Sequence, residues 1–262
     1  TQDQMQDMDA GKRKCWRLSA VILSFLSALL LSCILLVLSV LAASHLTPGY
    51  FEKEYEKYGV RETLPELSVD GTDGLAAVTK HLRSYLLHGQ DPEELQIEVT
   101  ADGETRPFFT EREIGHMGDV RVLYMTGIRI AAFALIFIII FMGSSRLLAC
   151  ENEPKIFRVS TGIGILCAAV PVLTGAAGMA VYVLGDFDRA FLRFHEVFFT
   201  NDLWIPDPAE GLLVRMLPQG FFFDTAYRIV LYYVVLMVLL IAAGAVLIVR
   251  GRRMPDYEYS AF

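Results

Sequence analysis

The sequence predicts a membrane α-helical protein with four transmembrane helices and a small mixed α/β extracytoplasmic cap. Hydrophobic residues make up 54% of the 262-residue chain, and the charged residues gather in blocks between long apolar runs. A helix needs about 20 apolar residues to cross a bilayer. The apolar runs therefore predict spans at residues 18–44, 122–149, 159–184 and 228–249.

Basic residues beside these runs predict the orientation of the chain. They precede the first span, flank the second connection and follow the fourth span: Lys12, Arg13, Lys14, Arg17, Arg146, Lys155, Arg158, Arg250, Arg252 and Arg253. Short segments rich in Lys and Arg stay in the cytoplasm. We therefore expect residues 1–17, 150–158 and 250–262 inside the cell, and the connections 45–121 and 185–227 outside.

The two outer connections are acidic. Residues 45–126 contain 16 acidic and 8 basic side chains, and residues 185–227 contain 7 and 3. Nucleic acids and anionic lipid head groups are negatively charged, so this balance disfavours both as partners. A cationic group, such as a protonated amine, would instead be attracted.

The first outer connection begins with aromatic rings among charged residues: Tyr50, Phe51, Tyr55 and Tyr58. Such rings line the boundary between bilayer and water, so we interpret them as an interfacial belt. Further along, Thr72 and Asp73 predict the start of a helix. Apolar residues at helical spacing continue it to Gly89.

Two short strands are predicted next. Residues 96–100 and 104–109 flank Asp102 and Gly103, a pair that favours a two-residue hairpin turn. Pro107 has no N–H to donate, so the second strand should lie at an edge of the sheet.

A helix is predicted to begin at Glu111, because Thr110 and Glu113 form a capping box. No proline lies between residues 107 and 154, so this helix can continue into the second span. His116 and Asp119 are three residues apart and share one face of it. We expect Asp119 to act as a supporting residue that fixes the tautomer of His116.

Small residues in the third span predict close contacts between membrane helices: Gly162, Gly164, Gly175 and Gly178. Pro171 predicts a kink in the same helix. Arg129 and Arg228 lie at the outer ends of the second and fourth spans. Two interpretations of these arginines remain open: extension toward the lipid–water boundary, or orientation of a substrate carbonyl.

The second outer connection is unusually aromatic. The residues around His195, and those after Pro218, include many rings: Phe191, Phe194, Phe198, Phe199, Trp204, Phe221, Phe222 and Phe223. Loops are normally polar, so these rings predict a buried pocket or contact with lipid. An imidazole in such a place titrates near neutral pH and is a candidate acid or base. His116 and His195 lie at similar heights relative to their spans, so they can meet.

Other classes of function remain open from the residues alone. His116, Asp119 and His195 could supply the three protein ligands of a catalytic zinc site. A non-enzymatic transporter or assembly factor, with the aromatic stretch only as an interfacial belt, is another alternative. The sequence lacks Walker, Rossmann, zinc-protease and serine-hydrolase motifs, which excludes most soluble enzyme classes.

Three segments carry a family resemblance: E-R-E-I-G-H-M-G-D-V-R at 111–121, F-H-E-V-F-F-T-N-D-L-W at 194–204 and M-L-P-Q-G-F-F-F-D at 216–224. They resemble the bacterial lipoprotein intramolecular transacylases, known as Lit. The resemblance implies an active site at the junction of cap and membrane, with His116 and His195 as catalytic residues. It also implies transfer of the sn-2 acyl chain of a diacylglyceryl-modified N-terminal cysteine to that cysteine's own α-amine, which yields a lyso-form lipoprotein.

The residues suit this chemistry. An α-amine has a pKa of about 8, so a base must remove its proton before it attacks an ester. A second histidine can then donate to the oxyanion or to the leaving glyceryl oxygen. The attack closes a ring of about eight atoms, which is entropically unfavourable unless a shaped pocket folds the substrate. The residues expected to bind substrate in that pocket are Phe194, Phe198, Phe199, Trp204 and Phe222.

We therefore expect an enzyme of the bacterial cytoplasmic membrane. Its expected partners are diacylglyceryl-modified lipoproteins and membrane lipid. We expect it to act as a monomer and without a cofactor.

Overall fold

The computed structural model describes residues 2–64, 66–148, 154–205 and 211–254. The predicted connection 150–158 and tail 250–262 lie partly outside these residues. The chain forms two compact units. The helix unit contains Thr1–Leu38, Ile130–Val181 and Leu231–Phe262, and the mixed unit contains Ser39–Arg129 and Tyr182–Val230.

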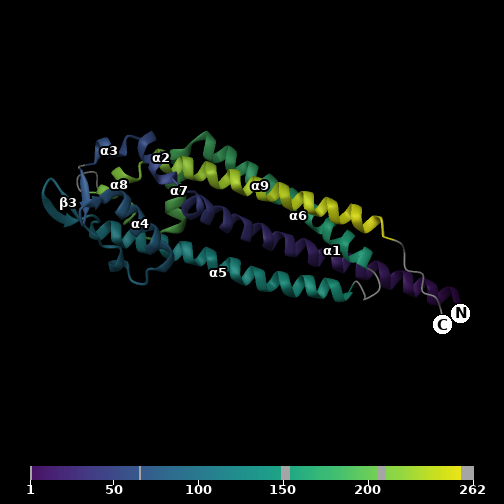
Figure 1. Cartoon of the computed structure of the whole chain (residues 1–262). Helices are drawn as coiled ribbons and strands as arrows, with labels where there is room; N and C mark the ends of the chain where they lie inside the picture. The colour runs from purple at the N-terminus through teal and green to yellow at the C-terminus, as the bar shows by residue number, and fades with distance from the viewer. Residues whose placement is uncertain (1, 65, 149–153, 206–210, 255–262) are drawn as a thin grey trace. The chain divides into compact units, whose positions relative to one another are not determined.

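Four long helices confirm the predicted membrane α-helical class. They are α1 (Gln2–Leu41), α5 (Glu111–Leu148), α6 (Pro154–Gly185) and α9 (Gln219–Arg252). Each contains a stretch that is long and apolar enough to cross a membrane. Figure 1 shows them running alongside one another through the helix unit. All four extend beyond the apolar runs, because polar residues that favour helices continue the backbone hydrogen bonding past the apolar part.

Small residues let the helices of the helix unit approach closely, as predicted for two of the four glycines in α6. A Cβ at Gly164 would lie 2.6 Å from the Cβ of Ser24 on α1, and one at Gly162 would lie 2.5 Å from the carbonyl oxygen of Gly244 on α9. The prediction is wrong for Gly175 and Gly178, because no described atom lies within 4 Å of a Cβ placed there. Only tertiary packing decides which glycines of a helix face a neighbour.

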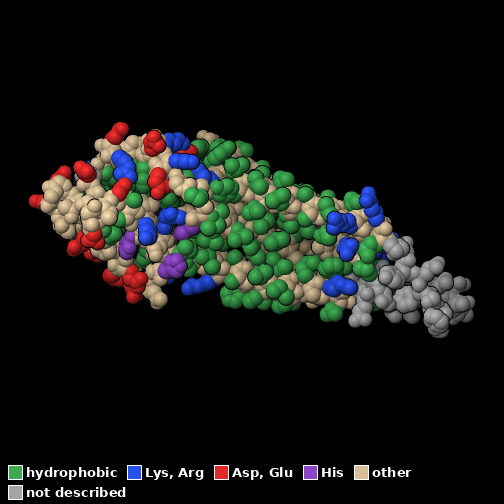
Figure 2. Space-filling view, viewed as in Figure 1, with side chains coloured by type: hydrophobic (Ala, Val, Ile, Leu, Met, Phe, Trp, Pro, Cys, Tyr) green, Lys and Arg blue, Asp and Glu red, His purple; other side chains and the backbone are tan. Residues whose placement is uncertain are grey.

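The outer surface of these helices is apolar, as a bilayer requires. Figure 2 shows hydrophobic side chains covering the visible face of the helix unit, whereas acidic side chains gather on the mixed unit. Large exposed side chains on α5 include Phe133, at 63% exposure, and Ile139, at 65%. Exposure of this kind is unfavourable in water and favourable in lipid.

The mixed unit contains an antiparallel sheet with strand order β2-β1-β3-β4. Strands β3 (Glu98–Ala101) and β4 (Glu104–Pro107) form the predicted hairpin, and β4 lies at the edge as Pro107 requires. Asp102 and Gly103 at its turn have φ of 53° and 83°, the geometry that Asp-Gly pairs favour.

A second hairpin was not predicted. Strands β1 (Leu67–Val69) and β2 (Thr72–Asp73) are joined by Asp70 and Gly71, which have φ of 49° and 75°. The same Asp-Gly signal was present in the sequence, but its flanking strands are only three and two residues long. Helix α4 (Gly74–His88) follows directly, and its cap is the side chain of Asp73, which accepts from the backbone N–H of Ala76 at 3.3 Å.

Helix α2 (Tyr50–Lys57) corrects the interpretation of the first aromatic cluster. Tyr50, Phe51 and Tyr55 are only 2%, 8% and 3% exposed, so they belong to a hydrophobic core and do not form an interfacial belt. The hydroxyl of Tyr55 lies 2.8 Å from Oγ1 of Thr79 on α4. The pattern of rings among charges is that of an amphipathic helix, and packing decides whether its apolar face meets protein or lipid.

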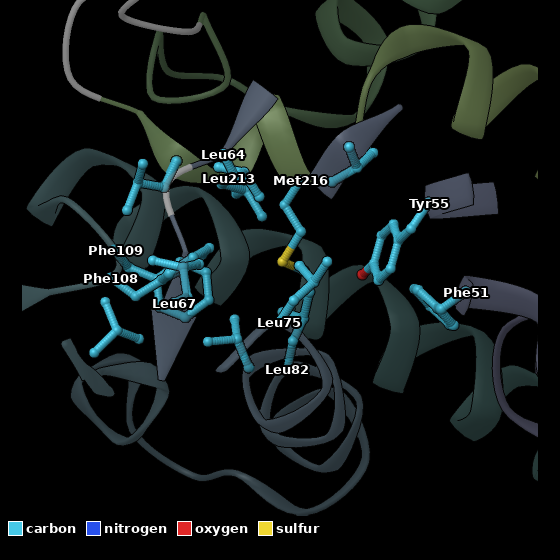
Figure 3. Packing of buried hydrophobic residues seen from close by; sticks show 14 of the residues in the cluster. Phe51, Tyr55, Leu64, Leu67, Leu75, Leu82, Phe108, Phe109, Leu213 and Met216 are labelled. Carbon is cyan, nitrogen blue, oxygen red and sulfur yellow. The ribbon is translucent and has the colours of Figure 1, made fainter. Parts of the chain in front are cut away.

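The core of the mixed unit also includes residues from the shorter helices and from the start of α5. Helices α3 (Val60–Thr63) and α8 (Leu212–Met216) and the 3₁₀-helix η2 (Pro92–Leu95) contribute Val60, Met216 and Leu95, each almost completely buried. Figure 3 shows Met216 among Leu75, Leu82 and Tyr55. Arg228, at the start of the predicted fourth span, places its guanidinium 4.0 Å from the ring centre of Tyr50. The guanidinium therefore packs against a buried ring of the mixed unit.

Substitution of Met216 tests whether this core holds the mixed unit together. Its side chain is 0% exposed, so Met216→Ala should leave a cavity that costs about 2–5 kcal/mol. We expect a clear fall in the melting temperature of the purified protein in detergent. The neighbouring Arg215 is exposed, so Arg215→Ala is the matched control and should melt like the parent. An unchanged melting temperature for Met216→Ala would contradict the described core.

Candidate active site

His195 lies on α7 (Phe187–Phe198), a helix within what the sequence suggested was an aromatic loop. Asp186 caps this helix, because its side chain accepts from the N–H of Arg189 at 3.0 Å. His195 is 7% exposed, and its Nδ1 lies 2.8 Å from the carbonyl oxygen of Phe191. A carbonyl oxygen only accepts, so Nδ1 must carry a proton. In the neutral imidazole, Nε2 is therefore left as the basic nitrogen.

Burial favours the neutral form of His195. Removal from water disfavours the imidazolium and lowers the pKa of His195, and the hydrogen bond to the Phe191 carbonyl opposes this only in part. The neutral form, which can accept a proton, therefore persists to lower pH than in an exposed histidine.

The structure brings His116 and His195 together. His116 lies in the second turn of α5, and its ring centroid is 5.8 Å from that of His195. Its Nδ1 is buried and has no hydrogen-bond partner among the described residues. The expected capping box places this turn: the hydroxyl of Thr110 accepts from the N–H of Glu113, and the Glu113 side chain accepts from the N–H of Thr110 at 2.9 Å.

Aromatic rings surround the two imidazoles. Four of them have centroids between 4.3 and 5.5 Å from that of His195: Phe191, Trp204, Phe194 and Phe199. Phe199 also lies 5.0 Å from His116, so it contacts both histidines. Of the residues expected to bind substrate, Phe194, Phe199 and Trp204 therefore border the histidine pair directly.

The other two expected substrate-binding rings lie one contact further out. Phe198 packs against Phe194 at 4.8 Å, and Phe222 packs against Phe191 at 5.3 Å. Phe194 and Phe198 are 46% and 51% exposed, whereas Phe199 is 7% exposed. The exposed pair can contact an apolar chain, while Phe199 is fixed by packing.

Asp119 does not bond to His116 as expected. Its Oδ2 accepts a hydrogen bond from Nδ2 of Asn201 at 2.8 Å. The two residues share a helix face, but a side-chain partner from another part of the chain occupies the carboxylate. Direct control of the His116 tautomer by Asp119 is therefore not the arrangement in the structure.

Sequence reasoning missed Asn201 and Arg112. The guanidinium of Arg112 donates to two backbone carbonyls, that of Ile205 at 3.0 Å and that of Asp202. Two signals were available: Asn201 lies within the aromatic motif, and Arg112, His116 and Asp119 recur at helical spacing on one face of α5.

A third histidine, His45, was also overlooked. It lies in the π-helix η1 (Ala42–Leu46), and its Nδ1 is 2.8 Å from both the Ser44 hydroxyl and the Tyr124 hydroxyl. Its Nε2 lies 3.2 Å from the carbonyl oxygen of Arg83. These bonds link α4 and α5 to η1.

The zinc alternative finds no support in the geometry. Within the described ranges, no three His, Cys, Asp or Glu side chains converge as metal ligands would. His116 and His195 are close to each other, but the Asp119 carboxylate is taken by Asn201. A three-ligand site built from these residues is therefore not formed.

The titration of His195 can be measured directly. Because burial lowers its pKa, we expect the imidazole to become protonated only below about pH 6.5, the usual value for histidine. The measurement is nitrogen NMR of histidine-labelled protein in detergent, with the His195 signal identified by its loss in His195→Gln. Titration at or above the usual value would show that the ring is more hydrated than the structure indicates.

Comparison with known proteins identifies the family of the chain. The family model for lipoprotein intramolecular transacylase Lit matches residues 25–222, a range that includes both histidines and all the surrounding rings. No curated protein sequence matches the chain significantly.

Solved structures share the fold. The membrane integral lipoprotein intramolecular transacylase Lit from Bacillus cereus is 18% identical, with a TM-score of 0.65 over 92% of this chain and 99% of that chain. Structures of the same protein with a histidine-to-arginine or a histidine-to-alanine mutation are 17% and 16% identical, with TM-scores of 0.58. They cover 96% and 95% of this chain, respectively, and 99% of their own. With three quarters of its length matched by the family model, the chain belongs to the Lit family of lipoprotein intramolecular transacylases, which are acyltransferases.

Proposed function

We propose that this protein moves the sn-2 acyl chain of a diacylglyceryl-modified N-terminal cysteine onto the α-amine of the same cysteine. The observation that carries the proposal is a pair of imidazoles, 5.8 Å apart between ring centroids, with aromatic rings around them. His195 is buried and His116 is half-buried. Membership of the Lit family supplies the reaction class, an acyl transfer on lipoproteins.

His195 acts as the general base in this proposal. Its Nδ1 proton is held by the Phe191 carbonyl, so Nε2 offers a lone pair to the substrate amine. The amine nitrogen attacks the ester carbonyl carbon as Nε2 takes an amine proton, and a tetrahedral intermediate with a negatively charged oxygen forms.

His116 acts as the hydrogen-bond donor. A neutral imidazole carries one N–H, which can stabilise the oxyanion. When the intermediate collapses, the bond from carbon to the glyceryl oxygen breaks, and that oxygen takes the proton that His195 received from the amine. Both imidazoles are then neutral again, so the reaction consumes no water and releases no second product.

The aromatic rings hold the substrate in a bent conformation. Amine and ester belong to one molecule, but they meet only if the glyceryl thioether folds back, which costs conformational freedom. The partly exposed rings of Phe194 and Phe198 offer apolar surface to an acyl chain. Trp204 covers His195 on another side, with ring centroids 5.0 Å apart.

We further propose that the mixed unit lies on the extracytoplasmic side, with both chain ends in the cytoplasm. The support is the distribution of basic residues along the sequence and the acidic surface of the mixed unit. We also propose that the protein acts as a monomer, because the described residues of one chain are enough to bring both histidines and the rings around them together.

Replacement of either histidine should abolish the product. We expect His195→Ala and His116→Ala to give no lyso-form lipoprotein while the protein stays folded, because one proton must move from the amine to the glyceryl oxygen and the oxyanion needs a hydrogen-bond donor. The measurement is mass spectrometry of lipoprotein N-termini from cells with each variant. His81 is half-buried on α4, where its Nε2 contacts the Glu94 carbonyl, so His81→Ala is the control. Product at the parental level in a histidine variant would remove that residue from the mechanism.

Truncation of the rings distinguishes a shaped pocket from simple anchoring in lipid. Misplacement of reacting groups by about 1 Å can cost on the order of 100-fold in rate, so Trp204→Ala and Phe198→Ala should slow conversion of a diacylated lipopeptide to its lyso form. Phe133, an exposed ring on the helix unit, provides the control Phe133→Ala. Purified variants are compared for rate and melting temperature. Equal rates in all three variants would contradict the pocket.

A further inference from the structure

The segment from Phe199 to Ile205, here called the bridging segment, lies between α7 and the undescribed residues 206–210. It has no helix or strand of its own. Its backbone is tied locally by the N–H of Ile205, which donates to the carbonyl of Asp202 at 3.2 Å. Such a short turn does not fix its own position, so contacts with other elements must do so.

Those contacts come from one face of α5. Arg112, Gly115, His116 and Asp119 follow the spacing of neighbours on a helix surface. Three of these four hold the bridging segment. Asp119 accepts from the Asn201 side chain, Arg112 donates to the carbonyls of Asp202 and Ile205, and Gly115 leaves room for Leu203.

The fit at Gly115 is close. A Cβ at this position would lie 2.8 Å from Cδ1 of Leu203, so a larger residue would require the Leu203 side chain to shift. The Asn201 side chain is itself oriented, because its Oδ1 accepts from the N–H of Leu203 at 3.0 Å while its Nδ2 donates to Asp119. Both ends of this one amide are therefore used.

The bridging segment carries two of the rings around the histidines. At its start, Phe199 contacts both imidazoles, and near its end Trp204 lies over His195 with an interplanar angle of 33°. The fourth residue of the α5 face is His116. One face of α5 therefore carries His116 and, through the bridging segment, also positions the Trp204 ring that lies over His195.

We propose that Asn201 and Arg112 are positioning residues, which act with Asp119 to clamp the bridging segment on α5 and so set Trp204 against His195. This inference rests on the proposed acyl transfer for its effect on rate. The position of the bridging segment on α5 does not depend on the reaction. The clamp assigns Asp119 a role in holding Asn201.

A charge exchange tests the clamp. Asn201→Asp places a second carboxylate against Asp119, which removes the donor and adds repulsion. Combining it with Asp119→Asn restores an amide facing a carboxylate, with the two positions exchanged. We expect Asn201→Asp to lower turnover of a diacylated lipopeptide by about 10- to 100-fold, and the double variant to recover to within a few-fold of the parent.

Fluorescence of Trp204 reports the geometry without relying on activity. The chain has two tryptophans, so Trp16→Phe leaves Trp204 alone as the emitter. A protonated imidazole quenches a neighbouring indole, and the parent should therefore lose emission as His195 is protonated. We expect Asn201→Asp to abolish this pH-dependent quenching and the double variant to restore it. Arg112→Lys should weaken it, because a lysine cannot reach two carbonyls at once in the manner of a guanidinium.

Asp102→Asn is the control, because Asp102 lies in a hairpin turn with a positive φ that asparagine also tolerates. Unchanged quenching in Asn201→Asp would overturn the proposal, whatever the turnover. Failure of the double variant to recover either signal would also overturn it, because Asp119 would then be acting through its charge at its own position. If the parent shows the quenching but makes no lyso product, the proposed function fails and the clamp stands.

Discussion

The positions of both histidines depend on the burial of apolar side chains in the mixed unit. Ile114 and Met117 on α5 belong to this core, and they turn the opposite face of the helix, with His116, toward α7. Phe221 at the start of α9 is also in the core, while its neighbour Phe222 packs against Phe191 of α7. Hydrophobic burial has no preferred direction. Here it nevertheless fixes the helices, and their opposite faces carry the two histidines and the surrounding rings.

The core places the helices approximately, and polar contacts then fix the orientation of individual side chains. Glu113 is an example of such a polar contact. One of its carboxylate oxygens caps α5 by accepting from the N–H of Thr110, and the other accepts from the N–H of Leu213 at the start of α8. The carbonyl of Phe191 selects the tautomer of His195, and the Asp119–Asn201 pair orients the bridging segment. Each bond is modest in energy, but each selects one geometry among several that the core would allow.

The helix unit is built on a different principle. Lipid is as apolar as a leucine side chain, so helices in a bilayer gain little from burying large apolar residues against one another. Close approach at Gly162 and Gly164 gives extensive van der Waals contact in its place, and large side chains such as Phe133 remain on the surface. Helix α5 contributes residues to both units. Its first part, in the mixed unit, carries polar residues and His116, whereas its second part, in the helix unit, is apolar and suits lipid.

Features that depend on neighbours along the chain could be predicted from the amino-acid sequence. Four apolar runs predicted four membrane helices, Thr110 and Glu113 predicted the start of α5, and Asp102-Gly103 predicted a hairpin. Periodicity, capping and turn preferences act within a few residues, so they can be recognised without a fold. The motifs around His116 and His195 predicted the family for a similar reason, because each is a continuous stretch.

Contacts between side chains on elements distant in sequence could be assigned only from the folded chain. It placed the rings of α2 in the core and not at a lipid boundary, left Gly175 and Gly178 without neighbours, and gave the Asp119 carboxylate to Asn201. A helix pattern fixes which residues share a face, but not what that face meets. The partner is decided by packing of the whole chain, because burial and close fit depend on residues that can be more than a hundred positions apart.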